Sequence, residues 1–297
     1  MRKPVSYNVL RHLIIDGYGQ GHGETYQPFL QVSRGHSSPC SYQIVTQLPG
    51  LKRKFHFLSR PEHYFALFLV WIGAEVREQY PLWPWRHAHP LCGHPQFPQY
   101  REVSGLLEIA KSAGIKHGSW VGTNIPYVAT TDILATHLVD HTPRLHAFAM
   151  KRESQLIDLS KYPRVSERLE LERRYFEEIR NSWRVVHDTL LPAPLTRNLE
   201  LIAGSANLAE TFDGEQLTRF SETFQGTSSN LPLEVAIHKS GSAVGLDPIR
   251  AHRYFRMCAW RGSVDIDLSK PMDMNLPMAA GGSVIRERFV KEFLPHD

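Results

Sequence analysis

The chain has 297 residues, of which 42% are hydrophobic and 22% charged, and its formal net charge at neutral pH is +4. Such a chain is expected to form one large or two ordinary globular domains, which excludes fibrous and low-complexity proteins. The longest apolar run, residues 65–72, is too short to span a membrane. The small positive charge is compatible with a nucleic-acid ligand but does not by itself indicate one.

The N-terminal segment and the cysteines bear on where in the cell the protein is expected. The first residues are basic but lack a long apolar core and a small-residue cleavage site, so no signal peptide is predicted. Cys40, Cys92 and Cys258 are scattered and odd in number. They favour reduced thiols in a cytoplasmic protein over a disulfide framework.

In chain order, residues 17–50 are rich in Gly, Ser, Gln and His, with a strand-like piece at 28–32. Basic and apolar residues then alternate over 51–57, which predicts a strand with one basic face. Ser59 and Glu62 form a capping-box pattern that starts an apolar helix. The helices and strands predicted up to residue 188 cover 59–72 (helix), 76–80 (strand), 103–112 (helix), 127–139 and 145–151 (strands), 166–180 (helix) and 183–187 (strand).

This order of elements predicts an α/β (α+β) fold, in which a small mixed sheet carries helices on its faces. Residues 191–195 contain two prolines and form the expected linker. Beyond it, helices are predicted at 195–203, 214–224, 231–237, 247–260 and 283–294, with a strand at 263–268. We therefore divide the chain into residues 1–190, 191–276 and a tail helix in 277–297.

Three side chains in the first part suggest a metal-dependent reaction. Glu62 stands at the start of the apolar helix, Asp132 lies in one predicted strand, and Lys151 ends the next. Two carboxylates can hold a hard cation such as Mg²⁺. A nearby lysine can orient or deprotonate water and offset charge on a phosphate. The simpler alternatives are that Glu62 only caps its helix, Asp132 is a strand-edge residue and Lys151 a solvated surface residue.

Two further polar residues are candidates for a supporting role around these three. Gln79 would face the site from a neighbouring strand, although strand pairing explains it nearly as well. Glu172 lies on the apolar stripe of its helix beside Arg173. The alternative to a site role for Glu172 is a buried ion pair with that arginine.

Other patterns indicate contacts with DNA or metal. The basic residues chosen as DNA-binding candidates are Lys52, Arg53, Lys54, Lys116, Arg250, Arg253 and Arg256, since phosphate contacts supply affinity. Solvated charged faces, and for the last three a partner-docking surface, are the alternatives. The alternating glycines at 17, 19, 21 and 23 match no nucleotide-binding motif, and they indicate a loop that tracks a DNA backbone or is simply flexible. His87, His89, Cys92 and His94 offer four possible zinc ligands, with a histidine-rich surface loop as the favoured alternative.

Several segments resemble the TnsA family, the endonuclease subunits of heteromeric transposases. These are GYGQGHGETYQPFLQV, LSRPEHYF, REQYPL, AGIKH, TTD and LELERRYFEE, in order through residues 17–188. A weaker similarity continues through VGLDPIRAHRYFRMCAWRGSVDIDLSKPM. The resemblance implies a restriction-endonuclease-like catalytic domain in residues 1–190 and a winged-helix-like domain in 191–276. It also implies cutting of double-stranded DNA at the 5′ ends of a transposon, with a DDE-type recombinase and a regulatory AAA+ ATPase as partners, and no membrane.

The resemblance places the family's catalytic residues on Glu62, Asp132 and Lys151. Mg²⁺, for which Mn²⁺ can substitute, would be held by Glu62, Asp132 and the backbone carbonyl of Met150. One position departs from the family pattern: Ala149 stands where Glu or Gln is usual. Two alternatives therefore stay open, a catalytically silent DNA-binding or scaffolding subunit and a stand-alone restriction or repair nuclease.

Overall fold

The computed structural model describes residues 6–32, 42–97, 99–206 and 212–295. It divides into two compact units. The first unit contains residues 1–46, 53–63 and 74–190, and the second contains 47–52, 64–73 and 191–297. Cys40, expected to be a reduced thiol, lies outside the described residues, whereas Cys92 and Cys258 are free thiols. Among the described helices, none has both the length and the apolar character needed to cross a bilayer.

The first unit is built on a four-stranded sheet with the order β3-β6-β7-β8. These strands are β3 (Glu75–Leu82), β6 (Ala129–Val139), β7 (Thr142–Lys151) and β8 (Ser182–His187). β3 and β7 each pair with β6 in antiparallel fashion, and β8 pairs with β7 in parallel. The sheet is therefore mixed, and the α/β fold class predicted from the sequence is confirmed.

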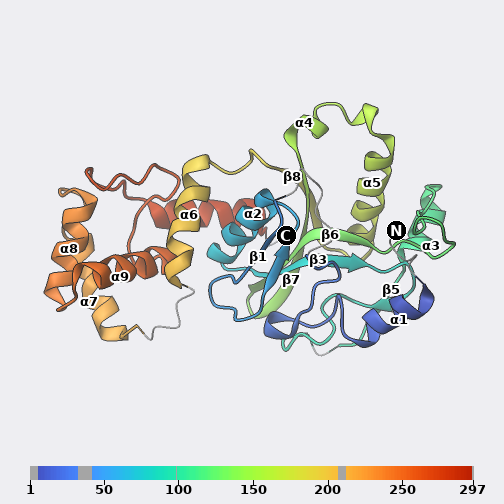
Figure 1. Ribbon diagram of the computed structural model, residues 1–297, viewed down its shortest axis with the longest axis horizontal. Helices are drawn as coiled ribbons and strands as arrows, with labels where there is room; N and C mark the ends of the chain where they lie inside the picture. Colours follow the sequence, from blue (N-terminus) through green and yellow to red (C-terminus); the bar gives the residue numbers. More distant parts are fainter. Residues whose placement is uncertain (1–5, 33–41, 98, 207–211, 296–297) are drawn as a thin grey trace. The chain divides into compact units, whose positions relative to one another are not determined.

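The connections explain why the sheet is mixed. β6 and β7 are joined by a tight turn in which Asp140 and His141 both have positive φ, 48° and 62°, as hairpin turns of two residues require. A parallel neighbour needs a longer crossover. The crossover from β7 to β8 consists of α4 (Glu153–Leu156), η2 (Leu159–Lys161) and α5 (Pro163–Glu178). Figure 1 shows α5 beside β8 at the end of this path.

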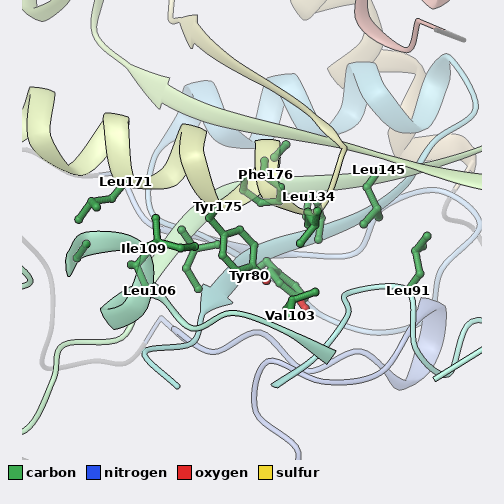
Figure 2. Packing of buried hydrophobic residues seen from close by; sticks show 14 of the residues in the cluster. Tyr80, Leu91, Val103, Leu106, Ile109, Leu134, Leu145, Leu171, Tyr175 and Phe176 are labelled. Carbon is green, nitrogen blue, oxygen red and sulfur yellow. The ribbon is translucent and has the colours of Figure 1, made fainter. Parts of the chain in front are cut away.

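The core of the first unit lies between the sheet and two helices, α5 and α3 (Leu106–Ala113). Figure 2 shows Phe176 of α5 near Leu134 of the sheet, with Leu171 and Leu145 toward opposite ends of the same buried cluster, to which Tyr175 also belongs. All five side chains are buried, and each such burial stabilises the fold by roughly 1.5–3 kcal/mol. The carboxyl end of α3 is closed by Gly114 in the left-handed conformation.

The remaining elements of the first unit are short, and several differ from expectation. They are α1 (Tyr7–Ile15), η1 (Gly23–Thr25), β1 (Ile44–Thr46), β2 (Phe55–Phe57), the start of α2 (Arg60–Trp71), β4 (His87–Ala88) and β5 (Glu102–Val103). The predicted strand at 28–32 is wrong, and of the strand predicted at 51–57 only the last three residues pair, with β1. The predicted basic face is not formed, because the side chain of Arg53 points into the protein and pairs with Glu78. The N-terminal helix α1, capped by Ser6, was not predicted.

The regular secondary structure described in the second unit is helical. It contains α6 (Ala193–Ala206), α7 (Gly214–Gln225), α8 (Leu233–Ala243), α9 (Pro248–Arg261) and α10 (Gly282–Phe293). The strand predicted at 263–268 is wrong, because Ile266 makes only an isolated bridge to Ala280. A winged-helix arrangement is not confirmed, since the described part of this unit has no two-stranded wing.

The tail helix is part of the second unit. Phe289 and Phe293 of α10 contact the rings of Phe65 and Phe68, which belong to the same unit, at centroid distances of 5.0–5.7 Å. The apolar face of this helix therefore packs on its own unit. Residues 277–297, expected to form a separate tail, are grouped with residues 191–276 in this unit.

Candidate active site

Glu62 lies in the first turn of α2 and serves as a helix cap as well as a candidate ligand. The backbone amide of Leu58 donates to Glu62 Oε2 at 3.0 Å, and the hydroxyl of Ser59 donates to Oε1 at 2.8 Å. The Glu62 amide in turn donates to the Ser59 hydroxyl at 3.4 Å. The side chain is only 6% exposed. These hydrogen bonds hold the carboxylate in one orientation. The capping role of Glu62 is therefore compatible with a role as a metal ligand.

Asp132, Met150 and Lys151 meet across the β6–β7 pair. Asp132 Oδ2 accepts a hydrogen bond of 2.6 Å from the Met150 amide and lies 3.5 Å from Lys151 Nζ. The same ammonium donates to the Met150 carbonyl at 2.7 Å. Lys151 therefore bridges the two oxygen atoms that were expected to take part in holding a metal. The proximity of the lysine and the aspartate, which the sequence could only suggest, is present.

Gln79 joins the same site through an irregularity in β3. Its φ is +48°, which is unusual for a residue with a side chain, and the ladder between β3 and β6 skips it between Glu78 and Tyr80. The Gln79 amide nitrogen donates to Glu62 Oε2 at 3.3 Å, and its amide oxygen accepts from the Thr130 hydroxyl at 3.1 Å. The side chain is buried, so Gln79 links β6 to the candidate ligand on α2.

Electrostatics shows that three acids share this neighbourhood. Burial, with the charge of Asp132 in second place, raises the pKa of Glu62 to about 8. The same two causes, in the same order, raise the pKa of Glu172 to about 7. Lys151 acts in the opposite direction on both groups. Two buried carboxyl groups whose ionisation is disfavoured, beside the carboxylate of Asp132, form an environment in which a cation is stabilised.

Glu172 does not form the ion pair that was the alternative to a site role. Arg173 bonds instead to Glu170 and Glu177, both at 2.9 Å. Glu172 is buried, and its Oε1 atom has no hydrogen-bond partner. Its position near Asp132 keeps it a candidate for a supporting role in the site.

A pocket of about 440 Å³ opens beside these residues, within the first unit. Glu62, Met150 and Lys151 line one part of it. The other lining residues include Arg60 and Arg152, and also Tyr42, whose ring lies 5.5 Å from the Arg60 guanidinium. Acidic and basic groups thus face one cavity, as a site for a cation and a phosphate requires.

Arg53 has an internal partner that sequence reasoning missed. Its guanidinium makes two hydrogen bonds to the buried carboxylate of Glu78, at 2.8 and 3.0 Å, and lies 3.5 Å from the centre of the Phe55 ring. Only 7% of its side chain is exposed. This ion pair argues against the expected DNA contact at Arg53.

The other basic candidates differ in exposure. Lys52, Lys54, Lys116 and Arg250 are exposed, whereas Arg253 and Arg256 are half-buried on α9. Their contact with DNA stays a prediction. The glycine-rich segment packs closely at two points. A Cβ on Gly19 would lie 2.3 Å from the ring of Pro81, and one on Gly21 would lie 2.6 Å from the carbonyl oxygen of Thr25. These close approaches explain two of its four glycines without any phosphate.

The histidine-rich loop does not gather its side chains around one point. His87 bonds to the Tyr175 hydroxyl at 2.8 Å, and Cys92 Sγ faces the carbonyls of Gln99 and Arg101. Within the described part of the chain, one group of three or more possible ligands has its atoms mutually close, and it is Glu234, His238 and His252. The zinc site considered for the loop is therefore not formed. The four-residue spacing of Glu234 and His238 was the available signal for the other group.

Two comparisons agree with the resemblance noted in the sequence. The family described as TnsA-like endonuclease N terminal matches residues 94–188, a range that includes Asp132, Lys151 and Glu172. The Tn7 transposition protein TnsA of Escherichia coli is 32% identical over 189 residues, which is 63% of this chain. This alignment spans 59% of that relative's length. Residues 94–188 therefore resemble the TnsA-like endonuclease domain, and the mixed sheet with flanking helices in the first unit agrees with a restriction-endonuclease-like fold.

Proposed function

We propose that this protein is an Mg²⁺-dependent DNA endonuclease that cuts the 5′ ends of a transposon during cut-and-paste transposition. The observation that carries the proposal is the convergence of Glu62, Asp132 and Lys151, of which Glu62 and Lys151 line one pocket. Lys151 Nζ lies 3.5 Å from Asp132, and Glu62 and Asp132 are close enough for one charge to raise the pKa of the other group. A DDE-type recombinase would cut the 3′ ends, and an AAA+ ATPase would regulate both.

The residues present fit a hard divalent cation. Glu62, Asp132 and the Met150 carbonyl supply oxygen atoms only, which is the ligand type that Mg²⁺ prefers. Two of them are carboxylates, and the buried one is costly to ionise without a cation nearby. When bound, Mg²⁺ would neutralise charge that develops on the scissile phosphate and favour deprotonation of the attacking water.

The protein's own groups would do the remaining work. Lys151 would hold the attacking water and stabilise the pentacovalent phosphorus, since its ammonium already lies at the site. Gln79 would keep Glu62 in place through the hydrogen bond between their side chains. In-line attack of water on phosphorus breaks the bond to the 3′ oxygen and leaves a 5′-phosphate and a 3′-hydroxyl.

The ligand set is modest, and this bears on when metal binds. Ala149 supplies only a methyl group, and the Met150 carbonyl is engaged by Lys151. Tight Mg²⁺ binding is therefore expected only when a DNA phosphate enters the pocket and adds its oxygen atoms. Little sequence readout is expected from the first unit, so the recombinase would choose the DNA ends.

The test is to incubate the purified protein with transposon-end DNA and Mg²⁺ or Mn²⁺, alone and with the recombinase and the ATPase. Cutting at the 5′ ends in the full mixture, lost in Asp132→Ala, is the expected result. If Asp132→Ala still cuts there, the assignment of the site is wrong.

The same experiment distinguishes the two other candidate functions. Ala149 favours a catalytically silent DNA-binding or scaffolding subunit, which would show no 5′ cutting under any condition, even with Mn²⁺. Efficient cutting without partners would favour a stand-alone restriction or repair nuclease. Winged-helix-type contacts by Arg250, Arg253 and Arg256 would appear as weaker DNA or partner binding when these residues are replaced.

A further inference from the structure

Three possible metal ligands converge in the second unit, away from the proposed nuclease residues in the chain. His238 Nε2 lies 2.9 Å from Glu234 Oε1, and His252 Nε2 lies 3.1 Å from the same oxygen atom. The ligand atoms of all three residues lie within 4.8 Å of one another. We propose that Glu234, His238 and His252 form a binding site for a zinc-type divalent cation.

The convergence follows from the packing of two helices. Glu234 and His238 are four residues apart on α8, which places them on the same helix face. His252 lies on the neighbouring helix α9. The helices approach closely because Gly241 faces Ala251, where an added Cβ would lie 2.4 Å from the alanine Cβ. The residue next to this close contact, His252, is therefore held against α8.

The distances are near those of a metal site. Zinc binds imidazole nitrogen at about 2.0–2.1 Å and carboxylate oxygen at about 2.0–2.2 Å in a tetrahedron, so neighbouring ligand atoms are roughly 3.3–3.5 Å apart. The two observed nitrogen–oxygen distances are within a few tenths of an ångström of this spacing. The imidazole rings meet edge to face, with centroids 5.7 Å apart, so the rings do not obstruct each other. Small side-chain movements would suffice to admit the cation.

The ligand types select the class of metal. Two imidazoles and one carboxylate suit Zn²⁺ and related transition metals, whereas Mg²⁺ and Ca²⁺ prefer oxygen alone. Three protein ligands leave a fourth position for water or for a group from a partner. His238 and Glu234 are each more than 40% exposed, so this position is open to solvent. The site would connect α8 to α9 and would differ in metal preference from the site at Glu62 and Asp132.

The simpler interpretation is a hydrogen-bonded cluster in which two histidines share one carboxylate. That cluster needs no metal, and it predicts no specific zinc affinity. The two interpretations therefore differ in a measurable property that does not involve nuclease activity.

The experiment is a titration of the full-length protein, freed of metal, with Zn²⁺ by calorimetry and with Co²⁺ by visible absorption. The expected result is a site whose Co²⁺ complex shows the strong absorption of tetrahedral coordination. His238→Ala, His252→Ala and Glu234→Gln should each weaken this binding by more than about tenfold, because each removes a direct ligand. Zinc should raise the melting temperature of the wild type by several degrees and should raise that of His252→Ala less.

Matched variants separate this site from other metal-binding groups. Lys239→Ala changes an exposed neighbour on α8 and should leave the titration unchanged. Asp132→Ala removes a proposed nuclease ligand and should leave the tetrahedral Co²⁺ absorption unchanged, so the two proposals can fail independently. Circular dichroism of each variant checks that it is folded, and His238→Gln provides a second test at a similar volume. Absence of tetrahedral Co²⁺ absorption, or equal Zn²⁺ affinity in the wild type and folded His238 and His252 variants, would overturn the proposal.

Discussion

The side-chain amide of Gln79 donates a hydrogen bond to Oε2 of Glu62 at 3.3 Å, from a residue whose backbone lies in the left-handed region with φ of 48°. A non-glycine residue in this region is disfavoured by roughly 1–2 kcal/mol. The strained residue is also the one that the β3–β6 pairing skips, between Glu78 and Tyr80. Strained backbone at a proposed functional site is consistent with a positioning role for Gln79.

Two substitutions of Gln79 should separate strain from function. Gln79→Gly and Gln79→Ala both remove the hydrogen bond to Glu62, so both should lower DNA cleavage. Only glycine relieves the positive φ, so Gln79→Gly should be more stable than Gln79→Ala by about 1 kcal/mol. Cleavage assays and urea unfolding of the two variants measure these effects. Wild-type cleavage by either variant would show that Gln79 does not position the site.

Replacement of Lys151 should affect metal binding and cleavage in opposite directions. Its ammonium holds both Asp132 Oδ2 and the Met150 carbonyl, so it competes with a cation for two proposed ligands. Lys151→Met should therefore abolish cleavage and increase affinity for Ca²⁺ by roughly tenfold, about 1.4 kcal/mol. Calorimetry with Ca²⁺ measures the second effect, with Lys54→Met as a control for loss of one charge. Unchanged or weaker Ca²⁺ binding would contradict this competition.

The pH dependence of stability should reflect the buried acids. The pKa of Glu62 is raised to about 8 and that of Glu172 to about 7, from 4.5. Because the folded state holds these protons more tightly than the unfolded state, their contribution is fully present below about pH 4.5. It is lost as pH rises through about 7 and 8. In EDTA, the free energy of unfolding should therefore fall between pH 5 and pH 9, by an amount on the order of a few kcal/mol.

Variants and metal provide the controls for this pH effect. Glu62→Gln and Glu172→Gln should each flatten the fall, because an amide does not titrate. Added Ca²⁺ should stabilise the wild type more at pH 8.5 than at pH 6, since the cation competes with protons for the carboxylates. Urea unfolding over this pH range is the measurement. A stability that rises with pH in EDTA, or that Glu62→Gln leaves equally steep, would contradict the assignment.

Arg53 and Lys54 are adjacent basic residues with different expected roles. Removing Arg53 leaves the buried Glu78 carboxylate without its partner, so Arg53→Ala should destabilise the fold by about 3–5 kcal/mol. Lys54→Ala should change stability by less than about 0.5 kcal/mol. If Lys54 contacts a phosphate, its replacement should reduce the salt dependence of DNA binding by about one unit of slope.

A paired replacement distinguishes these roles further. Arg53→Met with Glu78→Gln removes both charges and should recover part of the lost stability. Its DNA binding should keep the wild-type salt dependence if Arg53 has no phosphate contact. If the folded double variant shows a weaker salt dependence of DNA binding than the wild type, Arg53 does contact a phosphate.

Two glycine-to-alanine replacements in helices should have opposite effects. A Cβ at Gly241 would meet Ala251 at 2.4 Å, so Gly241→Ala should force α8 from α9 and destabilise by about 1–3 kcal/mol. Gly204 in α6 has no neighbouring atom within 4 Å of an added Cβ. Gly204→Ala should stabilise by up to about 1 kcal/mol through helix propensity. Thermal unfolding measures both changes in stability. Equal changes would show that α8 and α9 can move apart at little cost in free energy.

Local patterns in the sequence were sufficient for much of the first unit. Ser59 and Glu62 predicted the start of α2, because a capping box depends on residues only three positions apart. Alternating apolar residues predicted β6 and β7. The order of these elements predicted a mixed sheet, since a helix between two strands favours their parallel pairing.

Tertiary structure alone decided which side chains meet. Arg53 pairs with Glu78 across 25 residues, and this contact turns an expected DNA ligand into a core residue. The strand expected at 263–268 did not form, because a strand requires a partner that a local pattern does not specify. Likewise, His252 joins Glu234 and His238 only through the close packing of α8 on α9. The sequence by itself determined the short-range elements and the resemblance to TnsA proteins. Only the folded chain decided the long-range contacts, because they depend on how separate elements pack together.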